Sequence, residues 1–115
     1  MRELKNDEPF YLISQASKLL GITCDRLRTY EEELLIKPYR AKHSQDGKRL
    51  FSKNDIDWLV HIRELIKLGV SVPTVRILLV SEISPNKKFL KEKDLQIVSI
   101  IEKLKTHAVY GLLFQ

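Results

Sequence analysis

The sequence predicts a mostly α-helical fold, a winged helix-turn-helix with a two-stranded wing, followed by a C-terminal coiled-coil helix that dimerises the chain. Three observations predict it. Two short segments with apolar residues at helical spacing are separated by a glycine-containing turn at 21–23. A basic segment with Asp46-Gly47, a favoured hairpin turn, follows them. A longer segment with an apolar stripe, 89–110, ends the chain.

The chain has 115 residues, the size of one domain that buries a core without disulfides, and its single cysteine excludes an intramolecular one. No apolar run is long enough to cross a membrane and the charged start is no signal peptide, so we expect a cytoplasmic protein without a membrane partner. The expected organisation is a flexible N-terminus at 1–9, the winged domain at 10–82, a linker at 83–88, the dimerisation helix at 89–110 and a tail at 111–115.

Each element of the winged domain has start and stop signals. The candidate N-caps are Ser14, Thr23, Ser52 and Ser71, because their side-chain oxygens can accept a hydrogen bond from a first-turn amide. Gly21 and Gly69 follow the first and third helices, where glycine readily takes the left-handed conformation. The expected elements are helices at 15–20, 24–33, 53–68 and 72–80, strands at 39–43 and 48–51, and a last helix at 89–107.

The net charge of +5 lies in one segment. Six of the 20 basic residues but only one of the 15 acidic residues lie between Ile36 and Asn54, so the remainder of the chain is neutral. Such a distribution favours a polyanionic partner, although a charge run by itself is as typical of a solvated loop. Because the segment directly follows a helix-turn-helix, we expect the partner to be double-stranded DNA.

The second helix is expected to enter the major groove, where arginine can pair with guanine and hydroxyls can bind phosphates. Two interpretations of Tyr30 stay open, an outer DNA contact or a core residue, and the helix arginines could instead pair with the acidic residues 31–33. Basic residues of the hairpin are expected to bind phosphates. The candidate DNA contacts are Thr23, Arg26, Arg28, Thr29, Tyr30, Arg40, Lys42, Lys48 and Arg49.

The last helix has apolar residues at three- and four-residue steps, with Asp94 interrupting the row. A helix held off by a linker is not expected to bury such a stripe against its own body, so we predict a coiled coil with a second copy of the chain. A helix folded back on the domain is the alternative. The residues expected at the dimer seam are Leu90, Ile97, Ile101 and Leu104.

In their order and spacing, these blocks resemble the MerR family of transcription regulators. The matching segments are 13–23, 27–31, 35–40, 47–56 and 62–71. The resemblance implies a winged DNA-binding domain, an antiparallel coiled-coil dimer helix, and control of transcription by bending or untwisting promoter DNA or by simple repression. It also implies DNA contacts from Arg28 and Tyr30 on the recognition helix, from Arg49 on the wing and from Arg40 after the proline.

Departures from the family pattern concern the site. Leu34 stands where the family usually has glycine, and a leucine held in the left-handed conformation pays on the order of 1–2 kcal/mol, so we expect a remodelled helix end. Thr29 and Lys48 replace a common aromatic residue and a common tyrosine. The short form, without a sensor domain, resembles the heat-shock repressor branch, HspR, which implies a protein co-regulator as a further partner.

We therefore expect a sequence-specific transcriptional regulator, a repressor, that binds a pseudo-palindromic operator as a homodimer. A protein-interaction adaptor and an architectural or recombination DNA-binding protein with the same fold stay open as alternatives. The three histidines and one cysteine show no metal-ligand spacing, and no catalytic serine group or phosphate-binding glycine loop stands out. We expect no enzyme activity, no cofactor and no metal.

Overall fold

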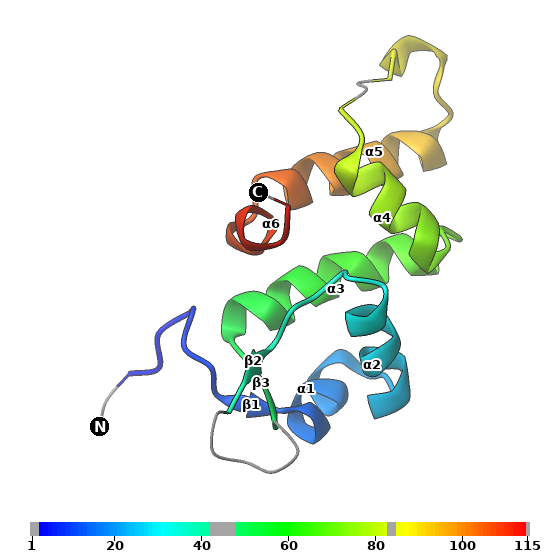
Figure 1. Ribbon diagram of the computed structural model, residues 1–115. Coiled ribbons are helices and arrows are strands. Elements are labelled where there is room, and N and C mark those ends of the chain that lie inside the picture. The colour runs from blue at the N-terminus through cyan, green and yellow to red at the C-terminus, as the bar shows by residue number, and fades with distance from the viewer. Residues whose placement is uncertain (1–2, 42–47, 83–84, 115) are drawn as a thin grey trace.

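The computed structural model describes residues 3–41, 48–82 and 85–114, and these residues form a mainly helical structure with a small sheet at one end (Figure 1). Helices α1 and α2 lie beside the sheet, α3 runs across the middle, and α4, α5 and α6 occupy the other end. The elements are β1 (Tyr11–Leu12), α1 (Ile13–Leu20), α2 (Cys24–Glu32), β2 (Tyr39–Arg40), β3 (Arg49–Phe51), α3 (Lys53–Lys67), α4 (Val72–Val80), η1 (Lys87–Phe89), α5 (Glu92–Lys105) and α6 (Ala108–Leu113).

The predicted helix-turn-helix is confirmed in α1 and α2, but Ser14 as the N-cap of the first helix is wrong. The N-cap of α1 is Leu12, whose amide donates to Oε1 of Gln15 at 2.8 Å. α1 ends at Gly21, whose φ of 69° lies in the left-handed region, and the amide of Ile22 donates to the Ser17 carbonyl at 3.0 Å. Thr23 is the N-cap of α2, and its Oγ1 accepts a hydrogen bond from the amide of Arg26 at 3.0 Å. The turn therefore follows from local interactions that the sequence already indicates.

The sheet has three strands in the order β1-β3-β2, one more than expected. β1 pairs with β3 antiparallel, Tyr11 opposite Phe51, and so covers an edge that a two-stranded wing would leave open. A strand of two residues is too short to show the alternation by which strands are recognised. The segment before it, expected to be flexible, is tied to α3, because the Asn54 amide donates to the Asn6 carbonyl at 2.9 Å.

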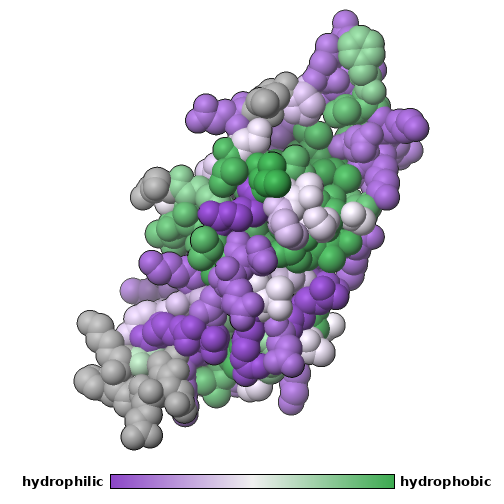
Figure 2. Space-filling view, turned by 45° about the vertical axis from the view of Figure 1, so that its right-hand side comes forward, coloured by the Kyte–Doolittle hydropathy of each residue, from purple (hydrophilic) through white to green (hydrophobic). Residues whose placement is uncertain are grey.

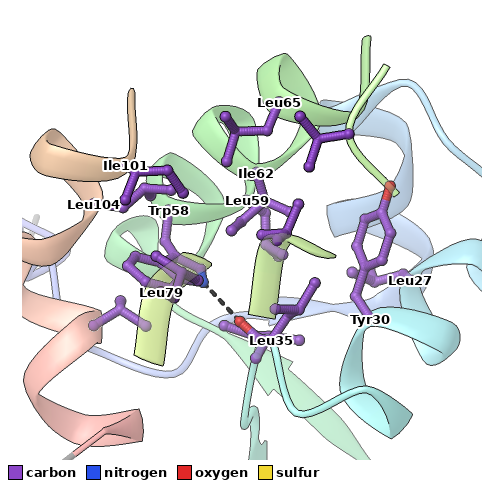
Figure 3. Packing of buried hydrophobic residues seen from close by; sticks show 14 of the residues in the cluster. Leu27, Tyr30, Leu35, Trp58, Leu59, Ile62, Leu65, Leu79, Ile101 and Leu104 are labelled. Atoms are coloured by element: carbon purple, nitrogen blue, oxygen red, sulfur yellow. Dashed lines mark hydrogen bonds between the residues drawn. The ribbon is translucent and has the colours of Figure 1, made fainter. Parts of the chain in front are cut away.

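Helix α3 forms the centre of the core (Figure 3). Ser52 and Asp55 make a capping box at its start, with reciprocal backbone-to-side-chain hydrogen bonds of 2.9 and 3.0 Å. Four α3 side chains are fully buried against residues of α2, α4 and α5, which makes one continuous core of the two ends of the molecule. These side chains are Trp58, Leu59, Ile62 and Leu65.

The C-terminal region differs from the expected single helix at 89–107. η1 precedes α5, α5 ends at Lys105, and His107 caps a separate helix, α6, by accepting a hydrogen bond from the Val109 amide at 3.1 Å. The expectation that α5 cannot bury its stripe against its own body is wrong for Ile101 and Leu104, which are buried in the core of the chain. The segment between α4 and α5 is long enough for α5 to turn back and pack on α3 and α4.

The other two residues expected at the dimer seam, Leu90 and Ile97, are half-buried. Tyr110 of α6 donates to the Leu79 carbonyl at 3.2 Å, and the Lys105 ammonium group donates to the Ser81 carbonyl. These bonds attach α5 and α6 to α4. No helix in the described ranges has both the length and the apolar character needed to span a bilayer.

Candidate nucleic-acid interface

The outer face of α2, the recognition helix expected to enter the major groove, carries polar side chains. Arg26 and Thr29 are exposed, and Arg28 is partly exposed. Arg28 makes an ion pair of 2.8 Å with Asp25, three residues earlier, and the Thr29 hydroxyl donates to the Asp25 carbonyl at 3.1 Å. Arg28 thus pairs with Asp25 of the same helix and not with the acidic residues 31–33. An exposed pair of this kind contributes at most about 1 kcal/mol, so Arg28 can exchange Asp25 for another acceptor at little cost.

Tyr30 is a core residue, so its placement on the outer surface was wrong. Its side chain is fully buried one helical turn after Leu27, and it points from α2 into the core (Figure 3). The phenol oxygen accepts a hydrogen bond from the Arg63 guanidinium at 3.1 Å. Residues three apart share a face of a helix, and here that face is the inner one.

The wing brings two of the predicted basic residues together. Arg40 of β2 lies opposite Arg49 of β3 in the sheet register. Both guanidinium groups donate to the carboxylate of Glu31 in α2, Arg49 through Nε to Oε2 at 2.5 Å and Arg40 through a terminal nitrogen to Oε1. Lys48 is exposed at the start of the second wing segment, whereas Lys42 and the Asp46-Gly47 turn lie outside the described residues.

The C-terminal end of α2 is closed by a Schellman motif with a leucine in the glycine position. Leu34 has φ 61°, its amide donates to the Glu31 carbonyl at 3.0 Å, and the Leu35 amide donates to the Tyr30 carbonyl at 2.9 Å. The expectation of a remodelled helix end was wrong. Leu34 adopts the conformation that glycine adopts in the corresponding motif at Gly21.

Tertiary contacts hold this helix end in place. The indole nitrogen of Trp58 donates to the Leu35 carbonyl at 2.7 Å (Figure 3), and a terminal nitrogen of Arg76 lies 3.4 Å from the carbonyls of Glu33 and Leu34. Because Leu35 is also fully buried, the chain leaving α2 has little freedom to relax the strained residue. The position of the recognition helix is therefore set from α3 and α4.

Three residues of the site were not predicted in the role that they have, and these are Glu31, Trp58 and Arg76. The signal for Glu31 was the acidic run at the end of the recognition helix, but its partners are nine and 18 residues away. Trp58 and Arg76 lie 23 and 42 residues from the carbonyls of Leu35 and Leu34 that they bind. No local pattern indicates such contacts.

Most of the chain matches a known family. The family model described as "MerR HTH family regulatory protein" matches residues 11–82. The HTH-type transcriptional regulator GlnR of Bacillus anthracis is 31% identical over 105 residues, which are 91% of this chain and 72% of that protein. The HTH-type transcriptional regulator ZntR of Escherichia coli K12 is 31% identical over 75 residues, 65% of this chain and 52% of that protein.

A solved structure has a similar fold. It is a crystal structure of HiNmlR, described as a MerR family regulator lacking the sensor domain, bound to promoter DNA. The TM-score is 0.53 with 23% sequence identity, and the superposition covers 83% of this chain and 67% of that chain. At 23% sequence identity, this similarity shows a shared fold and nothing further.

Proposed function

This chain belongs to the MerR family of helix-turn-helix regulatory proteins and is a DNA-binding transcription regulator, and we propose that it binds a pseudo-palindromic operator as a homodimer and acts as a repressor. One observation supports the DNA-binding surface in this proposal: the polar outer face of α2 lies beside a wing whose two arginines are held against that same helix. A base-reading element and a phosphate-binding element are thereby presented together.

The proposed contacts divide by chemistry. Arg26, Arg28 and Thr29 on α2 would face the major groove, where a planar guanidinium can pair with two acceptors of one guanine. Arg49 and Lys48 on the wing would bind phosphates and supply affinity and salt dependence without sequence choice. Tyr30 has no direct part in this proposal, because it is buried.

The proposed homodimer uses the part of α5 that does not face the core. Leu95 is 38% exposed, and with Ile100 of α5 and Leu68 beyond α3 it lines a groove of about 670 Å³. Apolar side chains gather over the half of the molecule that contains α4, α5 and α6, whereas the other half is mostly hydrophilic on the face drawn in Figure 2. A two-fold dimer through this half would relate two α2 helices by the symmetry that a palindromic operator has.

The test measures binding to a duplex that the wild-type chain has selected from a random-sequence pool. We expect Arg28→Ala with Arg49→Ala to lower affinity by at least about 30-fold, because each chain of the dimer loses one base contact worth about 1–3 kcal/mol. The salt dependence of binding should flatten by about two phosphate contacts, one from each chain of the dimer. The matched control removes two exposed charges, Lys87→Ala with Lys88→Ala, in η1 at the end of the molecule away from the sheet (Figure 1).

Three readouts decide the proposal. Equal affinities of the two double variants would contradict the assigned DNA contacts, and failure to select any duplex would favour the protein-interaction adaptor instead. Sedimentation of the complex should give two chains per duplex, and one chain per duplex would contradict the homodimer. A reporter gene behind the selected site should be transcribed less when the chain is present, and unchanged transcription would favour the architectural role.

A further inference from the structure

One carboxylate joins the recognition helix to both strands of the wing. Glu31 lies in the last turn of α2 and binds Arg40 of β2 and Arg49 of β3 with its two oxygens. The side chains of Glu31 and Arg49 are only 21% and 25% exposed, so this part of the network is shielded from water. Partial burial strengthens the Coulombic attraction between the two charges relative to an open surface pair, because the local dielectric constant is lower and salt screens the charges less.

The register of the sheet places two positive charges next to each other beside this carboxylate. Arg40 and Arg49 lie directly opposite each other on β2 and β3. Like charges in this arrangement repel, and the repulsion would drive the two side chains apart. A carboxylate that accepts from both guanidinium groups offsets the repulsion and gives both side chains one shared position beside α2.

We propose that Glu31 is a positioning residue for DNA binding, which holds the two wing arginines at a set place relative to the recognition helix so that both elements engage the duplex together. The proposal rests on the proposed function, because it requires Arg49 to contact DNA. A guanidinium has five N–H donors, and Glu31 uses the Nε of Arg49, so the terminal amino groups keep the capacity to donate to a phosphate. Two long side chains are then ordered before DNA arrives, and binding does not have to order them.

If Glu31 competed with DNA for the wing arginines, its removal would have the opposite effect on DNA affinity. If its carboxylate only competed with phosphate for the arginines, removing the charge would strengthen DNA binding. If it positions them, removing the charge weakens binding, although the chain has become more positive. The sign of the effect therefore separates the two roles.

The experiment compares Glu31→Gln with Glu32→Gln, which remove one negative charge each from adjacent positions of α2. Glu32 is exposed, so its variant reports the general effect of charge alone. Affinity for the selected duplex is measured by fluorescence anisotropy over a series of salt concentrations. We expect the Glu32 variant to bind the duplex as tightly as the wild type or more tightly. The Glu31 variant should bind about 10-fold more weakly than the Glu32 variant. Its salt slope should be flatter by about 0.9 for each phosphate that the variant no longer binds. Equal or tighter binding by the Glu31 variant would overturn the proposal.

Arg49→Ala separates this proposal from the proposed function. If Arg49→Ala does not weaken binding, the assigned wing contact is wrong. If it does weaken binding but Glu31→Gln does not, only the positioning role fails. Combining Glu31→Gln with Arg49→Ala should weaken binding by less than the product of the two single effects, because Glu31 acts partly through Arg49, and independent effects would count against the proposal.

A measurement on the wild-type chain keeps the test decisive if Glu31→Gln does not fold. The Nε–H proton of Arg49 should exchange slowly with water in an NMR spectrum of the free protein, because it is bonded to Glu31. It should stay protected after the selected duplex is added, since positioning requires the ion pair to persist in the complex. Rapid exchange of that proton in the complex would show that DNA displaces Glu31, which overturns the proposal.

Discussion

Leu34 carries a backbone strain that a substitution can measure. It is the only non-glycine residue with a positive φ among the described residues, and it closes the recognition helix in the Schellman motif. We expect Leu34→Gly to be more stable than Leu34→Ala. This reverses the usual order, because glycine normally destabilises a protein relative to alanine.

The magnitude follows from two opposing effects. A residue with a Cβ pays on the order of 1–2 kcal/mol in the left-handed conformation, and glycine does not. Glycine loses more conformational freedom on folding, at a cost of roughly 0.5–1 kcal/mol. The glycine variant should therefore be more stable than the alanine variant by about 0.5–1 kcal/mol. Alanine is the proper reference because Leu34 is 57% exposed, and both variants lose the same partial burial of the leucine side chain.

The assay is urea unfolding followed by circular dichroism, supported by thermal melting. The expected difference corresponds to a melting temperature about 2–6 °C higher for the glycine variant. Val60 is partly exposed in the interior of α3 and provides the control. There, glycine should be less stable than alanine by about 1 kcal/mol. The reasoning is refuted if glycine is no more stable than alanine at position 34 while the control behaves as expected.

Two further predictions concern the elements that support the site. Trp58→Phe should lower the free energy of unfolding, measured by urea titration, by about 1–3 kcal/mol, because the Leu35 carbonyl loses its indole donor in the core. An unchanged free energy of unfolding would contradict the importance of this hydrogen bond. Burial raises the pKa of Asp55 above its ordinary value of 3.8, against the hydrogen bonds from Ser52 and the charge of His107, which lower it. The folded state therefore holds the proton of the Asp55 carboxyl group more tightly than the unfolded state. The stability of the wild type relative to Asp55→Asn should fall as the pH rises from about 3 through the raised pKa. A rise in relative stability over that range would contradict the raised pKa.

The sequence by itself determined the features that depend on interactions within one or two helical turns. Thr23 and Ser52 were identified as N-caps, and Gly21 as a helix end, because each acts on backbone groups three to five residues away. The order of the helices followed from these signals, and the basic wing followed from the charge of residues 36–54 and the Asp46-Gly47 turn. The family resemblance carried the same information, since it rests on the same blocks.

Only the tertiary structure decided which side of each helix faces the core and which charges meet. Helical spacing is compatible with Tyr30 on either face of α2, and packing against α3 selected the inner one. A linker does not set the direction of the next helix, so the apolar stripe of α5 was equally suited to a partner or to the chain itself, and Ile101 is buried in the chain. The ion pairs of Glu31 with Arg40 and Arg49 exist because the sheet returns to α2, and that proximity arises from folding and not from any spacing along the chain.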